Sequence, residues 1–360
     1  MWAERLQELG HEVIISAFYG LAGAPAMWNG IRILPGNTPG DRYGAELLPL
    51  HVQREKIDLV ITLSDIWVIE PALLKGLPVA HWMPVDCTPL SSADQICLEH
   101  SGAIPVAMSR FGQKMLTDAG FDALYVPHGI DLGFWKPPET RDLTRQMLGA
   151  EGQFVIGINA ANKDSFRKGM FEQLSAFAQL HRRHPDTVML VHGLIQEPGA
   201  LNLQAMIARL GIEGAVRFVD QYDYLTGGVP VEHLRNWYGA LDLYTSCSFG
   251  EGFGLTIAEA IACGTPCVVT NASAMPEVMG AAGWKVPGEP FWNPVHNARW
   301  VKPDIGAILK VYEKAYQRGP EYKAKKAACA KAALAFDADR VLTEFWKPAL
   351  DELALRVGAS

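Results

Sequence analysis

The sequence predicts an α/β protein made of two Rossmann-like domains with parallel sheets. Three observations lead to this fold class. Short runs rich in Val, Ile and Leu alternate with longer amphipathic segments, as in parallel sheets crossed by helices. The chain has 360 residues, which is too long for one ordinary domain and long enough for two. A polar break with two prolines, FWKPPETRDLTRQMLG at residues 134–149, separates the two series of runs.

The strand-like runs fall into two groups. The first group contains HEVIIS, DLVITL, PVAHWM, PVAMS and ALYVPH, and the second contains FVIGIN, TVMLVHG, AVRFVD, DLYTS and PCVVT. Because Pro137 and Pro138 end the first series, we place one domain at residues 1–136 and the next at residues 137–335.

The beginning of the chain departs from the usual pattern. A doubly wound sheet opens with a strand and a Gly-rich turn, whereas this chain opens inside a helix that ends at Leu9 and Gly10. The usual first strand of the N-terminal domain is missing, and that strand is central in the common strand order. Two explanations stay open: residues upstream were lost, or the sheet is rearranged.

Residues 336–360 form the last segment, which we expect to be a C-terminal helix packing back on the first domain. Apolar residues recur there with a period of 3.6 residues. They are Val341, Leu342, Phe345, Trp346, Leu350 and Leu353.

Composition excludes several classes of protein. The net charge of −7 falls wholly on residues 1–135, so neither nucleic acid nor an anionic membrane surface is an expected partner. The longest apolar stretch, residues 57–83, is interrupted by charges and a proline and predicts no transmembrane segment. No signal peptide is recognisable, and the six scattered cysteines suggest reduced, buried thiols in a cytoplasmic protein.

The chemistry is expected in residues 242–260, DLYTSCSFGEGFGLTIAEA. A strand ends near Ser246, glycines follow at 250, 252 and 254, and a helix begins near Leu255. Glycines let the backbone approach a pyrophosphate, and the N–H groups of a helix start stabilise its charge. Glu251 and Glu259 lie on either side of the helix start, separated by seven residues, where their carboxylates can accept hydrogen bonds from hydroxyls.

This segment resembles the E-x7-E motif of the retaining glycosyltransferases of family GT4, the glycosyl transferases group 1. The resemblance extends over about residues 1–350 and implies a GT-B fold, with the two domains facing across a cleft. It implies that Glu259 binds the donor ribose, that Glu251 holds hydroxyls of the donor sugar, and that the backbone from Gly252 through Phe253 and Gly254 to Leu255 meets phosphate and sugar.

The same resemblance implies a cationic loop at residues 159–169, NAANKDSFRKG. The family's Arg is replaced by Ala161 or Asn162, which leaves Lys163, Lys168 and Arg167 to neutralise the leaving diphosphate. An ordinary surface charge is the alternative for each of them.

Four further residues are weaker candidates, each with a structural alternative. They are His81, which would touch the donor sugar, Asp86 and His128 on the acceptor side, and Tyr222, which would contact the base. The alternatives are a satisfied core histidine for His81, a loop cap for Asp86, a turn stabiliser for His128, and a core or surface tyrosine for Tyr222.

No metal and no cofactor are expected. The only Asp-x-Asp pattern of this kind, Asp337 and Asp339, begins the last helix and is interpreted as a helix cap. The resemblance implies transfer of a hexose from a UDP- or GDP-linked donor to a hydroxyl of a glycan or small-molecule acceptor by front-side displacement. The alternative is a non-catalytic nucleotide-sugar-binding or scaffold protein of the same fold, and a phosphorolytic or epimerising relative would need a site that the sequence does not show.

Overall fold

The computed structural model describes residues 1–18, 21, 23–36, 41, 43–197 and 199–358. The chain divides into two compact units. The N-terminal unit comprises Met1–Pro84, Pro89–Val126 and Leu342–Ser360, and the C-terminal unit comprises Val85–Thr88 and Pro127–Val341. No helix in the described part of the chain is long and apolar enough to cross a membrane.

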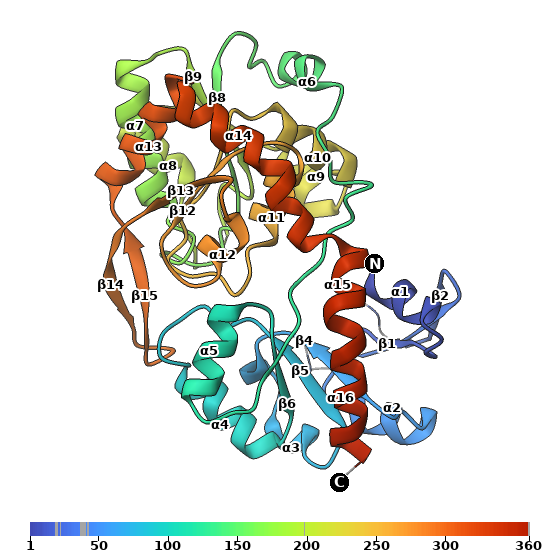
Figure 1. Cartoon of the computed structure of the whole chain (residues 1–360). Helices are drawn as coiled ribbons and strands as arrows, with labels where there is room; N and C mark the ends of the chain where they lie inside the picture. Colours follow the sequence, from blue (N-terminus) through green and yellow to red (C-terminus); the bar gives the residue numbers. More distant parts are fainter. Residues whose placement is uncertain (19–20, 22, 37–40, 42, 198, 359–360) are drawn as a thin grey trace. The chain divides into compact units, whose positions relative to one another are not determined.

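The N-terminal unit holds two separate sheets (Figure 1). One is parallel and contains, in spatial order, β4 (Val60–Leu63), β5 (Val79–Met83), β6 (Ile104–Ala107) and β7 (Leu124–Tyr125). The other has the order β1 (Ile14–Ser16), β3 (Ile31–Leu34) and β2 (Ala26–Trp28), with β1 parallel and β2 antiparallel to β3. Among the described residues no strand joins β1 to β4, so the two sheets are not continuous.

Helices of the N-terminal unit follow the expected alternation. They are α1 (Trp2–Glu8), α2 (Leu48–Glu55), α3 (Pro71–Leu74), α4 (Ser92–Ser101) and α5 (Arg110–Asp118), with a 3-10 turn at Ile66–Val68. Ser91 and Ser109 cap α4 and α5, each accepting the backbone N–H three residues ahead.

The end of the chain returns to the N-terminal unit. A π-helical turn, Leu342–Trp346, leads into α16 (Lys347–Gly358). The predicted apolar face is confirmed, since Val341, Trp346 and Leu353 are buried and its other three members are half-buried. The Trp346 ring meets those of Trp82 and Trp2 at centroid distances of 5.0 and 5.8 Å.

The C-terminal unit is built on a six-stranded parallel sheet. Its spatial order is β10 (Val216–Phe218), β9 (Thr187–His192), β8 (Phe154–Asn159), β11 (Leu243–Ser246), β12 (Cys267–Thr270) and β13 (Gly283–Val286). This is the doubly wound order of a Rossmann-like domain, whose ligands bind at the carboxyl ends of the strands.

The helices of this unit include several that position the site. They are α6 (Arg141–Met147), α7 (Met170–Arg183), α8 (Leu203–Leu210), α9 (Gln221–Thr226), α10 (Val231–Ala240), α11 (Leu255–Ala262), α12 (Met275–Met279), α13 (Ile305–Tyr316), α14 (Pro320–Ala333) and α15 (Ala338–Val341), with a 3-10 turn at Leu334–Phe336. Asp337 accepts the N–H groups of Asp339 and Arg340, which confirms the helix-cap interpretation of this aspartate.

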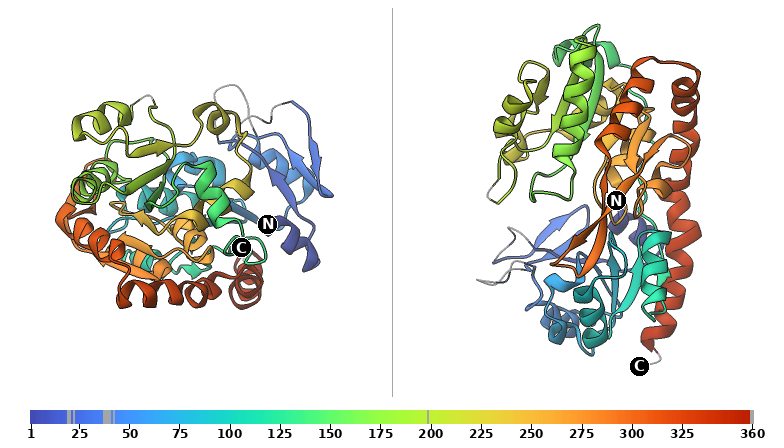
Figure 2. Two further views of the ribbon diagram at one scale, coloured as in Figure 1. Left: turned by 90° about the horizontal axis from the view of Figure 1, so that it is seen from above. Right: turned by 90° about the vertical axis from the view of Figure 1, so that its left-hand side faces the viewer.

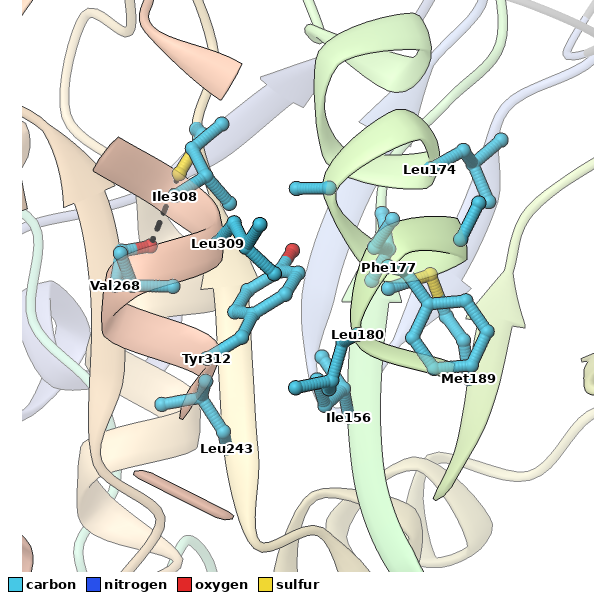
Figure 3. Packing of buried hydrophobic residues seen from close by; sticks show 14 of the residues in the cluster. Ile156, Leu174, Phe177, Leu180, Met189, Leu243, Val268, Ile308, Leu309 and Tyr312 are labelled. Atoms are coloured by element: carbon cyan, nitrogen blue, oxygen red, sulfur yellow. Dashed lines mark hydrogen bonds between the residues drawn. The ribbon is translucent and has the colours of Figure 1, made fainter. Parts of the chain in front are cut away.

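The core of this unit lies between the sheet and the helices α7 and α13 (Figure 3). Leu174, Phe177 and Leu180 point from α7, and Ile308, Leu309 and Tyr312 point from α13. They meet apolar side chains of β8, β9, β11 and β12, and all of these residues are at most 7% exposed. This packing fixes the strand ends from which the site loops leave.

An antiparallel hairpin stands apart from the six-stranded sheet (Figure 2). It consists of β14 (Gly288–Asn293) and β15 (Ala298–Pro303). One face, with Phe291 and Trp300, packs on Phe249 and Cys87, and Thr88 forms a bridge with Arg299. All six cysteines are buried and free of disulfides, as the sequence analysis predicts.

Candidate functional site

The glycine-containing loop lies between β11 and α11, at the carboxyl edge of the six-stranded sheet. Gly254 precedes α11 with a φ of +99°, a value that favours glycine, and no side chain caps this helix. Phe253 is buried against the rings of His128 and Phe336 at centroid distances of 5.1 and 5.3 Å, which fixes the loop. The start of α11 therefore presents uncapped N–H groups to an anion.

Glu251 is held by cations and hydroxyls. Its carboxylate lies 2.6 Å from Lys168 Nζ and 3.4 Å from Arg167 Nη1, and it accepts a 2.7 Å hydrogen bond from Ser248 Oγ. The Glu251 N–H donates to Ser273 Oγ at 2.9 Å. Although burial raises the pKa of Glu251, the two cations outweigh that effect and lower it, so this carboxyl is ionised at neutral pH.

The predicted cationic loop follows β8, the strand next to β11. Lys168 and Arg167 both reach Glu251, whereas Lys163 is exposed in the same loop. Asn162, one of the two residues expected at the place of the family's Arg, is buried, and its Nδ2 donates to the carbonyl of Leu201 at 2.8 Å. This side chain ties two loops together and supplies no charge.

Glu259 lies in the second turn of α11 and joins a chain of buried polar groups. Tyr238 donates its hydroxyl to Glu259 Oε2 at 2.9 Å, and Asn159 Nδ2 donates to that hydroxyl at 2.7 Å. Burial raises the pKa of Glu259 to about 7, while the hydrogen bond from Tyr238 lowers it. Glu259 can thus be a carboxylate that accepts hydroxyl hydrogens or a neutral acid near neutral pH.

Asp86 lies beside the glycine-containing loop. Its Oδ1 accepts a 3.1 Å hydrogen bond from Trp300 Nε1 on β15. A Cβ added to Gly250 would come within 2.3 Å of the Asp86 carbonyl oxygen, so the two backbones are in close contact. The hairpin therefore contacts Asp86, whose backbone lies against the loop that carries Glu251.

His81 is fully buried within β5. Its Nε2 donates to the Ser64 carbonyl at 2.9 Å, which leaves Nδ1 to accept from the Thr62 hydroxyl. Burial lowers its pKa to about 4, so the ring is neutral. This geometry favours the structural alternative of a satisfied core histidine.

The two remaining candidates differ in exposure. His128 is half-buried, and burial lowers its pKa to about 4. Its ring meets that of Phe253, so it supports the loop. Tyr222 on α9 is 74% exposed, as a ligand-stacking ring or a surface tyrosine would be.

Several residues of this site escape sequence reasoning. Tyr238 occurs in a helix whose pattern predicts only packing, and Trp300 occurs in a hairpin without a recognised motif. Asn159 and Ser248 lie in the expected segments 159–169 and 242–260, but nothing in the sequence marks their side chains as partners of Tyr238 and Glu251. Ser273, which accepts from the Glu251 N–H, is likewise unmarked. The family pattern marks Glu259, Glu251 and the cations beside Glu251, but not the hydroxyls of Tyr238 and Ser248 that donate to the two carboxylates.

Comparison with known proteins identifies the family. The sequence profile of the family described as Glycosyl transferases group 1 matches residues 157–293, which include both glutamates and the cationic loop. The D-inositol 3-phosphate glycosyltransferase of Paenarthrobacter aurescens is 30% identical over 321 residues, covering 76% of this chain and 75% of that protein.

Other relatives match a shorter part. The lipopolysaccharide core biosynthesis mannosyltransferase LpcC of Rhizobium leguminosarum is 29% identical over 157 residues, which are 43% of this chain and 42% of that protein. This match, like that to LpsB of Rhizobium meliloti, spans about two fifths of the relative's length.

Solved structures share the fold. Sucrose-phosphate synthase from Thermosynechococcus elongatus aligns with a TM-score of 0.75 at 16% identity, covering 99% of this chain and 92% of the other. Anabaena Alr3699/HepE, solved with UDP and glucose, aligns with a TM-score of 0.68 at 18% identity, covering 90% and 87%. The predicted GT-B fold of two Rossmann-like domains is confirmed.

Proposed function

The chain belongs to the family of glycosyl transferases group 1, and on that premise we propose that it transfers a hexosyl group from a nucleoside diphosphate sugar to a hydroxyl acceptor with retention of configuration. The observation that carries this proposal is the group of Glu251, Lys168 and Arg167 beside the uncapped start of α11. It combines a carboxylate for sugar hydroxyls with cations and N–H groups for a diphosphate.

The diphosphate makes the largest electrostatic demand in such a reaction. As the glycosidic bond to the leaving phosphate breaks, negative charge grows on the phosphate oxygens. Lys168, Arg167, Lys163 and the N–H groups of Gly254 and Leu255 would stabilise that charge. A divalent metal is then not required, and we propose metal-independent transfer.

Front-side displacement uses no covalent nucleophile from the protein. The acceptor hydroxyl attacks the anomeric carbon from the face that the diphosphate leaves, and the departing phosphate takes the proton. Glu251 would hold donor-sugar hydroxyls, while Glu259 would accept hydrogen bonds from the ribose.

The donor and acceptor are proposed from relatives. A GDP-mannose-dependent mannosyltransferase of Mycolicibacterium smegmatis and an Anabaena protein solved with UDP-glucose support a UDP- or GDP-linked hexose. The D-inositol 3-phosphate glycosyltransferases support a small-molecule acceptor, and the lipopolysaccharide core mannosyltransferase LpcC supports a glycan. We propose a cytoplasmic location, where the six free thiols stay reduced.

A donor screen tests the proposal. The protein is incubated with UDP-, GDP- and ADP-linked glucose and mannose, and donor hydrolysis or transfer is followed by mass spectrometry together with the thermal shift. Turnover of one donor, lost in Glu251→Gln and kept in Glu213→Gln on an exposed turn, is the expected result. Binding of a donor without turnover would instead favour the scaffold alternative, for which the uncharged Asn162 is the motivating departure.

A further inference from the structure

A line of buried polar groups runs through the C-terminal unit from β9 to α11. His192 Nδ1 lies 3.2 Å from Asn159 Oδ1, Asn159 Nδ2 lies 2.7 Å from the Tyr238 hydroxyl, and that hydroxyl lies 2.9 Å from Glu259 Oε2. These four residues come from β9, β8, α10 and α11. We call them the Glu259 relay.

The chemistry of each group fixes the direction of the hydrogens. The ionised form of Glu259, the form that can receive hydrogen bonds from a ribose through both oxygens, only accepts, so the Tyr238 hydroxyl donates to it. The phenol oxygen then accepts from the amide of Asn159, and the Asn159 carbonyl oxygen accepts from the His192 ring. Every donor in the relay therefore points toward Glu259.

Packing holds the Tyr238 side chain in one position. Its side chain is fully buried, and its ring meets those of Trp237, Tyr244 and Trp135 at centroid distances of 5.2, 5.4 and 6.0 Å. Burial raises its pKa well above its ordinary value, so the hydroxyl keeps its hydrogen at any working pH. Among the residues that the structure describes, Tyr238 is the side chain that donates to Glu259.

We propose that Tyr238 is a positioning residue for nucleotide recognition: through its hydrogen bond to one carboxylate oxygen of Glu259, backed by Asn159, it orients the other oxygen toward the ribose hydroxyls of the donor. This inference rests on the proposed function, in which Glu259 binds the ribose. It goes beyond that function by assigning the preference for ribose over deoxyribose partly to Tyr238, a residue that touches no ligand itself. If the Glu259 side chain were flexible, the entropy lost on ordering it would offset part of the free energy of each hydrogen bond to the ribose.

The test compares nucleotides with and without ribose hydroxyls. Isothermal titration calorimetry measures the affinity of the whole chain for UDP, GDP and ADP and for their 2′,3′-dideoxy analogues. The wild-type protein should prefer the ribonucleotide, and Tyr238→Phe should reduce that preference about tenfold, since it removes one hydrogen bond to a charged group. Its affinity for the dideoxy analogue should stay unchanged.

A matched control removes another buried hydroxyl of the same unit. Tyr312 is also fully buried, and its hydroxyl donates to Thr245 Oγ1 at 3.0 Å, away from the relay. Tyr312→Phe should keep the full ribose preference, although it also loses a buried hydrogen bond. If Tyr238→Phe does not fold, Asn159→Ser, which removes the donor to the phenol oxygen, replaces it with a smaller expected loss.

The outcomes separate the inference from the proposed function. If Glu259→Gln loses the ribose preference and Tyr238→Phe keeps it, the positioning role is overturned and the proposed function stands. A parallel drop in affinity for both kinds of nucleotide in Tyr238→Phe would also overturn it, because that result indicates a purely structural role. A wild-type protein that binds none of the nucleotides overturns both.

Discussion

Lys168 Nζ lies 2.6 Å from Oε1 of Glu251, and this ion pair joins the loop after β8 to the loop after β11. Both side chains are mostly buried, at 17% and 13% exposure. The pair therefore fixes the distance between the cation that we propose for the diphosphate and the carboxylate that we propose for the sugar. Its charge and geometry lead to the first prediction.

Lys168→Met should lower kcat of the donor reaction about 100-fold or more, because it removes a cation from the leaving diphosphate. It should also raise the pKa of Glu251, since Lys168 is the largest influence that lowers it. Steady-state kinetics measure kcat, and the acidic limb of its pH profile should move to higher pH in the variant. Lys310→Met, on an exposed turn of α13, should leave kcat unchanged. Equal rates for Lys168→Met and the wild type would contradict the role of this cation.

Glu259→Gln should make the fold more stable above neutral pH while weakening nucleotide binding. Burial raises the pKa of Glu259 from 4.5 to about 7, so between these values the folded protein keeps a proton that the unfolded chain releases. Wild-type stability therefore falls as pH rises through this window, and the loss is complete above pH 7. Glutamine does not ionise, so the variant avoids this loss, and its free energy of unfolding at pH 8 should exceed that of the wild type by at most about 3 kcal/mol.

Urea unfolding at pH 4.5, 6 and 8 measures this difference. The two proteins should have similar stability at pH 4.5 and diverge as pH rises. Glu213→Gln, on an exposed turn, should show no such divergence. A difference between wild type and Glu259→Gln that is constant across pH would mean that Glu259 is not the titrating group.

Much of the fold could be predicted from the sequence because periodicity reports burial directly. The strand FVIGIN and the face of Val341, Trp346 and Leu353 are buried as their patterns predict. The hairpin β14–β15 could not be predicted, since its register depends on pairing with itself and on Thr88, more than 200 residues earlier.

The candidate site was predictable where a motif specifies chemistry and not where tertiary contacts do. Glycines and two glutamates at a helix start indicate a phosphate and hydroxyl site without any structure. Which cation reaches Glu251 depends on the loop path, so Lys168 and the exposed Lys163 looked equivalent in the sequence. Likewise, a buried histidine such as His81 looks like a ligand until both its nitrogens are seen to be occupied.

Asp242→Asn should destabilise the C-terminal unit. This aspartate is 3% exposed and accepts from Arg145 Nη2 at 2.7 Å, Arg141 Nη2 at 2.9 Å and the Val155 N–H at 2.9 Å. Removing its charge leaves partly buried guanidinium groups without a counterion, at a cost of about 3 kcal/mol. Urea denaturation measures the loss. Asp118→Asn, which breaks an exposed pair with Lys114, should cost less than about 1 kcal/mol.

Gly250→Ala should lower kcat/KM without removing any chemical group. The added Cβ would lie 2.3 Å from the Asp86 carbonyl oxygen and 2.9 Å from Cδ1 of the Trp300 ring, so the loop must move away from the hairpin. Because Glu251 is the next residue, its carboxylate would shift from the donor sugar, and a displacement near 1 Å costs about 100-fold in rate. Donor turnover and the Tm, measured together, distinguish this effect from unfolding.

Gly214→Ala is the matched control for that substitution. An added Cβ at Gly214 meets no atom within 4 Å, so both turnover and the Tm should stay at wild-type values. If Gly250→Ala keeps full activity with a normal Tm, the contact between loop and hairpin does not position Glu251. Trp300→Phe removes the hydrogen-bond donor to Asp86. If both Gly250→Ala and Trp300→Phe lower the activity, the hairpin supports the loop that carries Glu251.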